Sequence, residues 1–295
     1  MKTALFAALA AVAIVFAAIW VSALLGPTEQ CRRPGWLETG VGFVTNVFDT
    51  LGIGSFATTS AFFKLWGMVP DEQIPGTLVV GHTPPSLLQA FIFIAVVQVD
   101  LATLVLMIAS SAVGSWLGAG IVSRLPRRKI RLGMGSALLG AAVVMTMTQL
   151  QWIPGGGESL GLSGASLVLA VAGNLLFGAL MTLGIGLYAP CMILISLLGM
   201  NPRAAFPIMT GSCAVLMSVG SVPFIRAERY SLKAALGLTA GGIPGVLLAA
   251  FVVKSMPLSA MRWLVVAVVI YTASMMLRSA RMERRANREA VGVVV

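Results

Sequence analysis

Thr50-Leu51-Gly52-Ile53-Gly54 occurs a second time in this chain as Thr182-Leu183-Gly184-Ile185-Gly186, and both copies lie within hydrophobic stretches. The register continues at the same spacing, pairing Leu65 with Leu197, Gly67 with Gly199, Met68 with Met200, Pro70 with Pro202 and Pro75 with Pro207. After one deleted residue it resumes, pairing Leu101 with Leu232, Gly114 with Gly245, Pro126 with Pro257 and Arg131 with Arg262. An internal repeat with a glycine break in an apolar segment is typical of the central site of a transporter.

The composition indicates an integral membrane protein. Hydrophobic residues make up 58% of the 295 residues and charged residues only 10%, whereas soluble domains carry about 25% charged residues. The net charge of +10 comes largely from a basic loop at 124–131 and a basic tail at 278–288. Such clusters are typical of the cytoplasmic flanks of membrane helices. A phosphate-binding basic patch is the weaker alternative, and we expect no nucleic-acid partner.

The reactive side chains give no sign of an enzyme. Cys31, Cys191 and Cys213 lack paired or metal-ligand spacing, and the chain has one histidine. The order of residues contains no serine–histidine–aspartate triad, nucleotide loop or kinase signature. We therefore expect no metal, no cofactor and no catalytic residue.

Apolar segments predict an all-α membrane protein with one domain over residues 1–295. Residues 4–25 are predicted to form a first membrane helix. A cleaved signal peptide is the competing interpretation, but this apolar run is longer than the apolar part of a signal peptide. Each repeat then supplies three segments long enough to cross a membrane about 30 Å thick. They are 76–98, 101–123 and 131–149 in repeat 1 (36–149), and 205–225, 232–253 and 261–278 in repeat 2 (166–278). Residues 154–164 connect the halves, and residues 279–295 form a basic cytoplasmic tail.

Residues 36–65 and 166–198 are too long for one straight membrane helix. Each would extend about 45–50 Å as a continuous helix, so we expect each to break into a helix–turn–helix element. Irregular backbone at membrane depth is tolerated where it is buried in protein or lines a cavity.

The basic segments predict the topology. If 124–131 and the tail are both cytoplasmic, an even number of crossings separates them, and the broken element 166–198 enters and leaves on one side. Each repeat then crosses the membrane three times, and this odd number inverts the second repeat relative to the first. Together with the first helix this gives about seven crossings, with the N-terminus outside and the tail inside. Lys2 disfavours that orientation, so eight crossings with parallel repeats remain the alternative.

The pattern resembles the TauE/SafE sulfite exporter family over about residues 36–278. The resemblance rests on Leu51-Gly52-Ile53-Gly54 and Gly67-Met68-Val69-Pro70, on Leu183-Gly184-Ile185-Gly186 and Gly199-Met200-Asn201-Pro202, and on Thr210-Gly211-Ser212. It implies a transporter in the cytoplasmic membrane for sulfite, organosulfonates or related anions. Ser55 and Leu187 follow the glycine turns where the family commonly has a longer glycine run.

A half-helix that restarts after each glycine turn directs unpaired amides and the positive end of its dipole at the membrane midplane, which suits an anion. Hydroxyl residues after the first turn can cap that helix, and Pro190 places the second restart near Tyr188. Close helix packing by small residues is the alternative role of the glycines. The predicted substrate-binding residues are Gly52, Gly54, Ser55, Thr58, Thr59, His82, Thr83, Gly184, Gly186, Tyr188, Thr210 and Ser212. For His82, burial as a hydrogen-bonded structural residue is the preferred alternative.

Asn46, Asp49 and Thr50 share one helix face before the first turn, and we assign them to coupling. An acid inside a membrane segment is costly and usually faces a cavity or a partner. A fixed negative charge on Asp49 would repel an anionic substrate at the same site. Protonation of Asp49, a bound sodium ion or a hydrogen-bonded structural role of Asp49 would each remove that conflict.

The sequence thus predicts a secondary transporter that exports a small anion by alternating access. A passive anion channel on the same fold and a membrane scaffold without substrate are the alternatives. The expected partners are the anion, membrane lipids and a coupling proton or sodium ion, and the sequence leaves a homodimer open.

Overall fold

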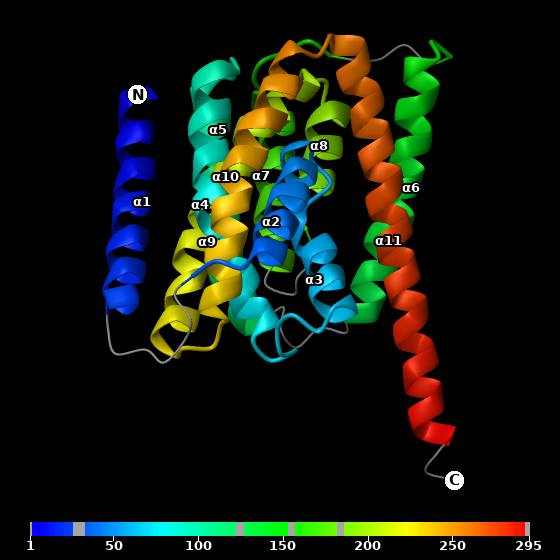
Figure 1. The fold of residues 1–295 in the computed structure, drawn as a ribbon. Coiled ribbons are helices and arrows are strands. Elements are labelled where there is room, and N and C mark those ends of the chain that lie inside the picture. The colour runs from blue at the N-terminus through cyan, green and yellow to red at the C-terminus, as the bar shows by residue number, and fades with distance from the viewer. Residues whose placement is uncertain (1, 26–32, 122–126, 153–156, 182–185, 293–295) are drawn as a thin grey trace.

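The computed structural model describes the backbone of residues 2–25, 33–121, 127–152, 157–181 and 186–292. Over these residues the regular structure is helical (Figure 1). The helices are α1 (Lys2–Leu25), α2 (Trp36–Thr50), α3 (Ser55–Leu65), α4 (Ile74–Val96), α5 (Leu101–Ile121), α6 (Arg127–Gln149), α7 (Gly164–Met181), α8 (Tyr188–Leu197), η2 (Pro202–Ala204), α9 (Ala205–Arg226), α10 (Leu232–Ser255) and α11 (Leu258–Gly292).

Seven helices of the described residues are long and apolar enough to span a membrane. The number agrees with the prediction. The seven include α7, which the sequence placed in a broken element, and α5 is described with its side chains only over Leu101–Leu117. Length alone admits α7, which at 18 residues extends about 27 Å. Figure 1 nevertheless shows α7 and α8 as the two arms of a hairpin.

Two helical hairpins enter the molecule from opposite ends (Figure 1). The hairpin α2–α3 enters from the lower edge of the view and α7–α8 enters from the upper edge. Both segments that the sequence predicted to break do so, and their tips approach each other inside the molecule. Helices α4 and α9 lie beside the tips and are among the most buried candidate spans.

The two halves pack reciprocally. Helix α2 of the first half lies against α10 of the second, and α7 of the second lies against α5 of the first. The corresponding backbones meet at paired glycines: a Cβ on Gly114 would lie 1.9 Å from the carbonyl oxygen of Leu175, and one on Gly245 would lie 2.6 Å from that of Phe43. Helices α4 and α9 also pair with each other, as do α6 and α11. Each half therefore packs a hairpin helix of the other.

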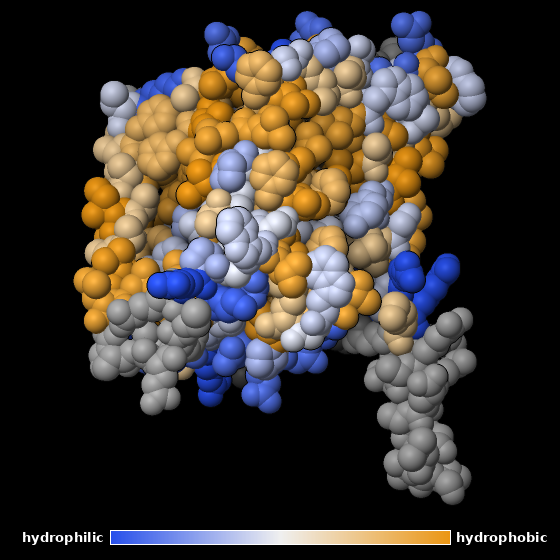
Figure 2. All heavy atoms as spheres, in the orientation of Figure 1, coloured by the Kyte–Doolittle hydropathy of each residue, from blue (hydrophilic) through white to orange (hydrophobic). Residues whose placement is uncertain are grey.

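The surface matches a membrane environment. On the face shown in Figure 2, apolar residues cover much of the area between the two ends, and the most hydrophilic residues lie toward those ends. The first helix packs on α9 and α4, with Leu9, Phe16 and Trp20 buried in the main core. The N-terminus and the C-terminal end of α11 lie at opposite ends of the molecule (Figure 1).

Candidate functional site

The first glycine turn is built by backbone conformation. Helix α2 ends with the Gly52 amide donating to the Asp49 carbonyl at 2.8 Å and the Ile53 amide donating to the Phe48 carbonyl at 3.0 Å. Gly52 and Gly54 have φ values of +95° and +86°, which L-residues with a side chain adopt only at a cost. The chain thereby reverses within a few residues, and α3 begins at Ser55.

Asp49 joins the two arms of this hairpin. Its Oδ1 accepts a hydrogen bond from the Ser55 amide at 2.7 Å, and its Oδ2 accepts one from Gln89 Nε2 of α4 at 3.0 Å. Gln89 also donates to Thr50 Oγ1 at 3.1 Å, and its Oε1 accepts from the Tyr188 hydroxyl at 3.1 Å. One buried network therefore connects Asp49 of the first hairpin to Tyr188 at the start of α8 through a side chain of α4.

A second buried network holds the histidine. His82 Nδ1 lies 3.0 Å from Asn46 Nδ2, and His82 Nε2 lies 3.0 Å from Thr59 Oγ1. Asn46 Nδ2 also donates to the Gly42 carbonyl at 2.8 Å. His82 Nδ1 also lies 3.3 Å from Asn46 Oδ1. His82 thus ties α4 to both arms of the first hairpin.

A small cavity of about 50 Å³ lies where the hairpin tips meet. Four pairs of its lining residues occupy equivalent positions in the two repeats: Asp49 with Met181, Gly54 with Gly186, Ser55 with Leu187, and Phe56 with Tyr188. The rest of the wall comes from Ile53, Ser86, Ala189, Cys213, Met217 and Thr272. One water molecule needs about 10–15 Å³ of cavity volume, so the cavity admits water or a very small solute.

The cavity wall carries no cationic side chain among the described residues that line it, and its one carboxyl group is Asp49. The Thr272 hydroxyl of α11 is buried and has no hydrogen-bond partner. The first amides of α8 have no intrahelical acceptors, and no side chain caps its N-terminus at Leu187. The equivalent end of α3 differs, because the Asp49 carboxylate already accepts its first amide.

The structure describes the second turn only from Gly186 onward. Thr182, Leu183, Gly184 and Ile185 lie outside the described residues. Helix α8 begins at Tyr188, where the sequence placed the restart. A Cβ added to Gly186 would meet no described atom within 4 Å.

The predicted residues separate into three groups. Asp49, Gly54, Ser55, Gly186 and Tyr188 line the cavity, while Gly52, Asn46, Thr50, Thr59 and His82 lie in the turn or in the networks beside it. The others are absent from its wall: the hydroxyls of Thr58, Thr83 and Thr210 donate to carbonyls of their own helices, and Ser212 accepts from Asn174.

The predicted hydroxyl cap of α3 is wrong. The helix starts at Ser55, so its N-cap position is Gly54, which makes no side-chain hydrogen bond. Thr58 and Thr59 already lie within the helix and cannot occupy the cap. The carboxylate of Asp49, six residues before Ser55, satisfies the amide instead.

Several residues of the cavity wall, and one beside it, escaped the sequence analysis. Gln89, which joins Asp49 to Tyr188, is a fully buried amide, and a polar side chain inside a membrane helix was the available signal. Cys213 and Met217 of α9 resemble ordinary apolar filling, and their sequence carries no sign that they face a cavity. Thr272 likewise lies in the apolar sequence of α11.

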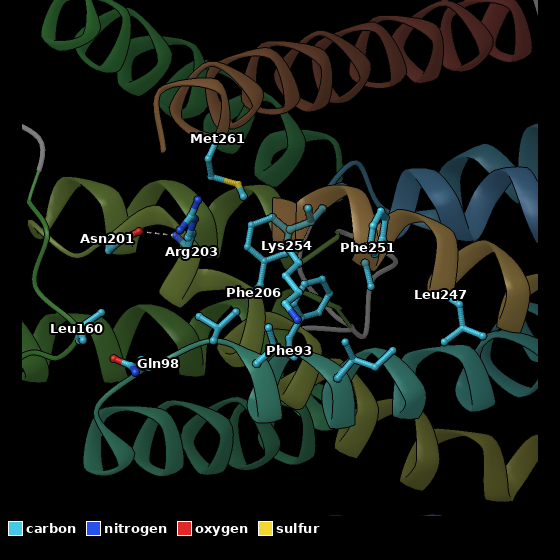
Figure 3. Close-up of a pocket in the computed structure, with 15 residues that line it drawn as sticks. Phe93, Gln98, Leu160, Asn201, Arg203, Phe206, Leu247, Phe251, Lys254 and Met261 are labelled. Atoms are coloured by element: carbon cyan, nitrogen blue, oxygen red, sulfur yellow. Dashed lines mark hydrogen bonds between the residues drawn. The ribbon is translucent and has the colours of Figure 1, made fainter. Parts of the chain in front are cut away.

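A second, larger cavity of about 630 Å³ lies between α4, α9 and α10 and shares no lining residue with the first (Figure 3). Its wall contains Arg203 and Lys254 among aromatic side chains. None of the predicted site residues reaches it.

Residues 1–145 match the family described as Sulfite exporter TauE/SafE. The match covers α1 and most of repeat 1, and it confirms the resemblance to this family over the first copy of the repeated motif. No curated protein and no solved structure matches the chain. The family match and the apolar helices together imply a multi-pass membrane transporter of sulfur-containing anions.

Proposed function

We propose that this chain, whose N-terminal half matches the TauE/SafE family, is a secondary transporter that exports a small sulfur-containing anion such as sulfite or an organosulfonate across the cell membrane. The observation that carries the proposal is the meeting of the two hairpin tips at a cavity lined by equivalent residues of both repeats. Broken helices that meet in this way form the substrate sites of transporters built from internal repeats.

The arrangement of the two halves supports alternating access as the mechanism in this proposal. In Figure 1, α4 runs from the lower edge upward and its equivalent α9 runs downward, as expected for inverted repeats. If the two halves exchange their conformations, the cavity opens to the opposite side of the membrane. The reciprocal contacts of α2 with α10 and of α7 with α5 supply the interfaces on which such a movement takes place.

The two hairpin tips have different roles in this proposal. The N-terminus of α8 offers unpaired amides to the anion, whereas the N-terminus of α3 binds the Asp49 carboxylate. Asp49 repels an anion in the same cavity unless its charge is neutralised. A proton or a sodium ion bound together with the substrate neutralises it, so Asp49, with Asn46 and Thr50 beside it, couples export to a cation gradient.

The test is flux through the purified protein in liposomes. Sulfite and a small alkylsulfonate are loaded inside, and efflux is measured with and without imposed proton and sodium gradients. Gradient-dependent accumulation against the anion gradient supports the transporter. Conductive flux that follows only the anion gradient supports a channel on the same fold, and no flux of either anion supports a scaffold.

A further inference from the structure

The larger cavity has a polar end at the molecular end opposite the C-terminus. The Arg203 guanidinium donates through Nη2 to the carbonyl oxygen of Met256, which holds it against the α10–α11 connection. Its Nε is buried and has no hydrogen-bond partner. Lys254 lies in the last turn of α10 and extends toward Phe93 in Figure 3. The described lining residues include no acid, so the polar end carries an uncompensated positive charge.

The rest of this cavity is apolar and opens to the side of the molecule. Phe93 and Phe206 are buried, with ring centroids 5.1 Å apart, and form its inner wall. Leu247 and Phe251 of α10 are 52% and 72% exposed and stand at its outer rim (Figure 3). These exposed side chains belong to a helix expected to cross the membrane, so the opening faces lipid chains.

The cavity suits a ligand larger than the transported anion. Its volume of about 630 Å³ is far above the 50 Å³ of the central cavity. A sulfite ion has no apolar part to fill the space between the aromatic rings. A ligand that fits both ends carries a negative headgroup and a long apolar chain.

We propose that this cavity binds an anionic phospholipid of the surrounding leaflet. Its phosphate lies between Arg203 and Lys254, where the guanidinium and the ammonium group supply charge-assisted hydrogen bonds. An acyl chain passes between the Phe93–Phe206 wall and the rim formed by Leu247 and Phe251. The bound lipid joins the ends of α4 and α10 to the start of α9.

The experiment is lipid retention by the purified full-length protein, measured by native mass spectrometry after exchange into micelles that contain phosphatidylglycerol or phosphatidylcholine. A basic residue near a membrane surface contributes about fivefold to binding of an anionic lipid. We expect K254Q to lower phosphatidylglycerol retention by about that factor and to leave phosphatidylcholine unchanged. K64Q is the matched control, because Lys64 is also an exposed cation but lies at the far end of α3.

A second variant tests the apolar end. F251A removes a side chain of the rim that is mostly exposed, so the fold does not depend on it, and we expect weaker retention of both lipids. Equal phosphatidylglycerol retention in wild type, K254Q and F251A would overturn the proposal. Displacement of the lipid by excess methanesulfonate would overturn it as well, because the cavity would then be a vestibule for the transported anion.

Discussion

The Asp49 carboxylate accepts the Ser55 amide at 2.7 Å across the first glycine turn. The acid at the end of α2 therefore caps the next helix of its own hairpin. A negative charge is stabilised at a helix N-terminus, so the position provides the carboxylate with a favourable field inside an apolar region. Met181, the equivalent residue of the second repeat, has no carboxylate to offer to α8. The two repeats therefore differ in side-chain chemistry at the site.

The first prediction concerns the two glycine turns. Alanine at Gly54 must adopt a φ near +86°, which costs about 1–3 kcal/mol, whereas alanine at Gly186 meets no atom within 4 Å. We expect Gly54→Ala to lose most flux and Gly186→Ala to retain it. The measurement is sulfite efflux from liposomes with matched amounts of folded protein. An equal loss of efflux in both variants would show that the left-handed backbone at Gly54 is not the reason for the lost flux.

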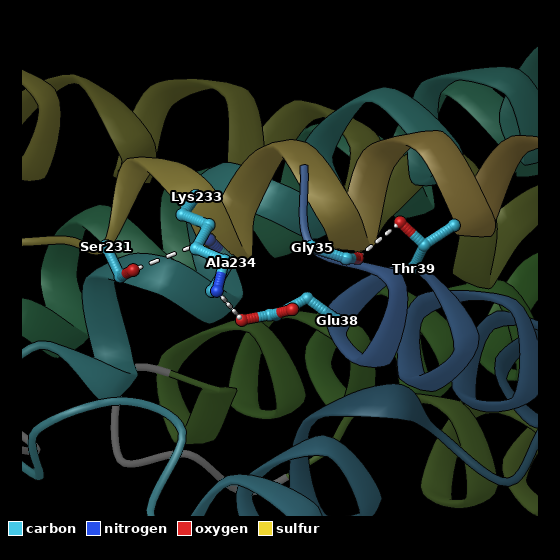
Figure 4. Close-up of polar contacts among 6 residues, drawn as sticks. All are labelled: Gly35, Glu38, Thr39, Ser231, Lys233 and Ala234. Atoms are coloured by element: carbon cyan, nitrogen blue, oxygen red, sulfur yellow. Dashed lines mark hydrogen bonds and ion pairs between the residues drawn. The ribbon is translucent and has the colours of Figure 1, made fainter. Parts of the chain in front are cut away.

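The second prediction tests the reciprocal packing of the halves. Figure 4 shows α2 against α10, joined at one end by an ion pair between Lys233 Nζ and Glu38 Oε1 of 3.3 Å. A Cβ on Gly241 would lie 1.8 Å from the Thr39 carbonyl oxygen, so the helices must separate to admit alanine. Small residues allow this close approach of membrane helices.

We expect Gly241→Ala and Gly114→Ala each to lower the free energy of unfolding by about 1–3 kcal/mol, as overpacking does elsewhere. Gly140→Ala in α6 is the control, since nothing lies within 4 Å of its added Cβ. Thermal unfolding in detergent measures all three. A control that is as unstable as the two interface variants would contradict the close-packing argument.

The third prediction is the topology. The C-terminal end of α11 and the start of α6, which carries Arg127, Arg128 and Lys129, lie at the end of the molecule away from the N-terminus (Figure 1). The excess of basic residues marks this end as cytoplasmic. Reporter tags at residue 2 and residue 295 should therefore report opposite sides, with the C-terminal one inside. Tags on the same side would leave the seven-crossing arrangement without support.

The sequence predicted the parts of the fold that depend on local signals. Apolar length indicated the helices, and the two overlong segments with their register-matched glycines indicated the hairpins. Asp49 was identified because an isolated acid is conspicuous in an apolar helix. Its cap on Ser55 was not predicted, because that bond depends on the three-dimensional path of the turn rather than on spacing.

The sequence pattern did not predict the contacts between the two halves. The repeat shows that Gly114 and Gly245 are equivalent, but it does not say that each packs on the first hairpin helix of the other half. The same limit applies to Thr83, which was assigned to the site beside His82, and to Thr210 and Ser212 of the repeated motif. Thr83 and Thr210 donate to carbonyls of their own helices, and Ser212 accepts from Asn174. Hydroxyl groups in membrane helices often donate to the carbonyl one turn earlier, so a hydroxyl alone does not mark a site.

The fourth prediction uses a second equivalent pair, the caps of α5 and α10. Asp100 Oδ2 accepts the Thr103 amide at 2.8 Å, and Ser231 Oγ accepts the Ala234 amide at 3.4 Å. The hydrogen bonds from Thr103 lower the pKa of the Asp100 carboxyl below its ordinary value. Replacing either cap by alanine should cost about 1 kcal/mol of unfolding free energy.

Only the Asp100 cap should depend on pH. The pKa of the Asp100 carboxyl is depressed in the folded state. The contribution of this cap to the free energy of unfolding is therefore complete above the ordinary aspartate pKa and is lost as the pH falls through the pKa of the folded state. The difference in stability between wild type and Asp100→Ala should therefore shrink in acid, and that between wild type and Ser231→Ala should stay constant. A constant difference for both caps would contradict the assigned role of the carboxylate.

The last prediction concerns Asp49 itself. Asp49→Asn keeps an oxygen that can accept the Ser55 amide, but it cannot ionise. If Asp49 carries the coupling proton or holds the coupling cation, this variant should lose gradient-driven accumulation and retain substrate binding or downhill exchange. Asp49→Ala is the matched comparison, because it removes the cap as well and should also lower thermal stability. Substrate binding, and efflux with and without a proton or sodium gradient, are measured on the folded variants. Gradient-driven flux that is unchanged in Asp49→Asn would assign the carboxylate to structure alone, since the amide would then be a sufficient cap for α3.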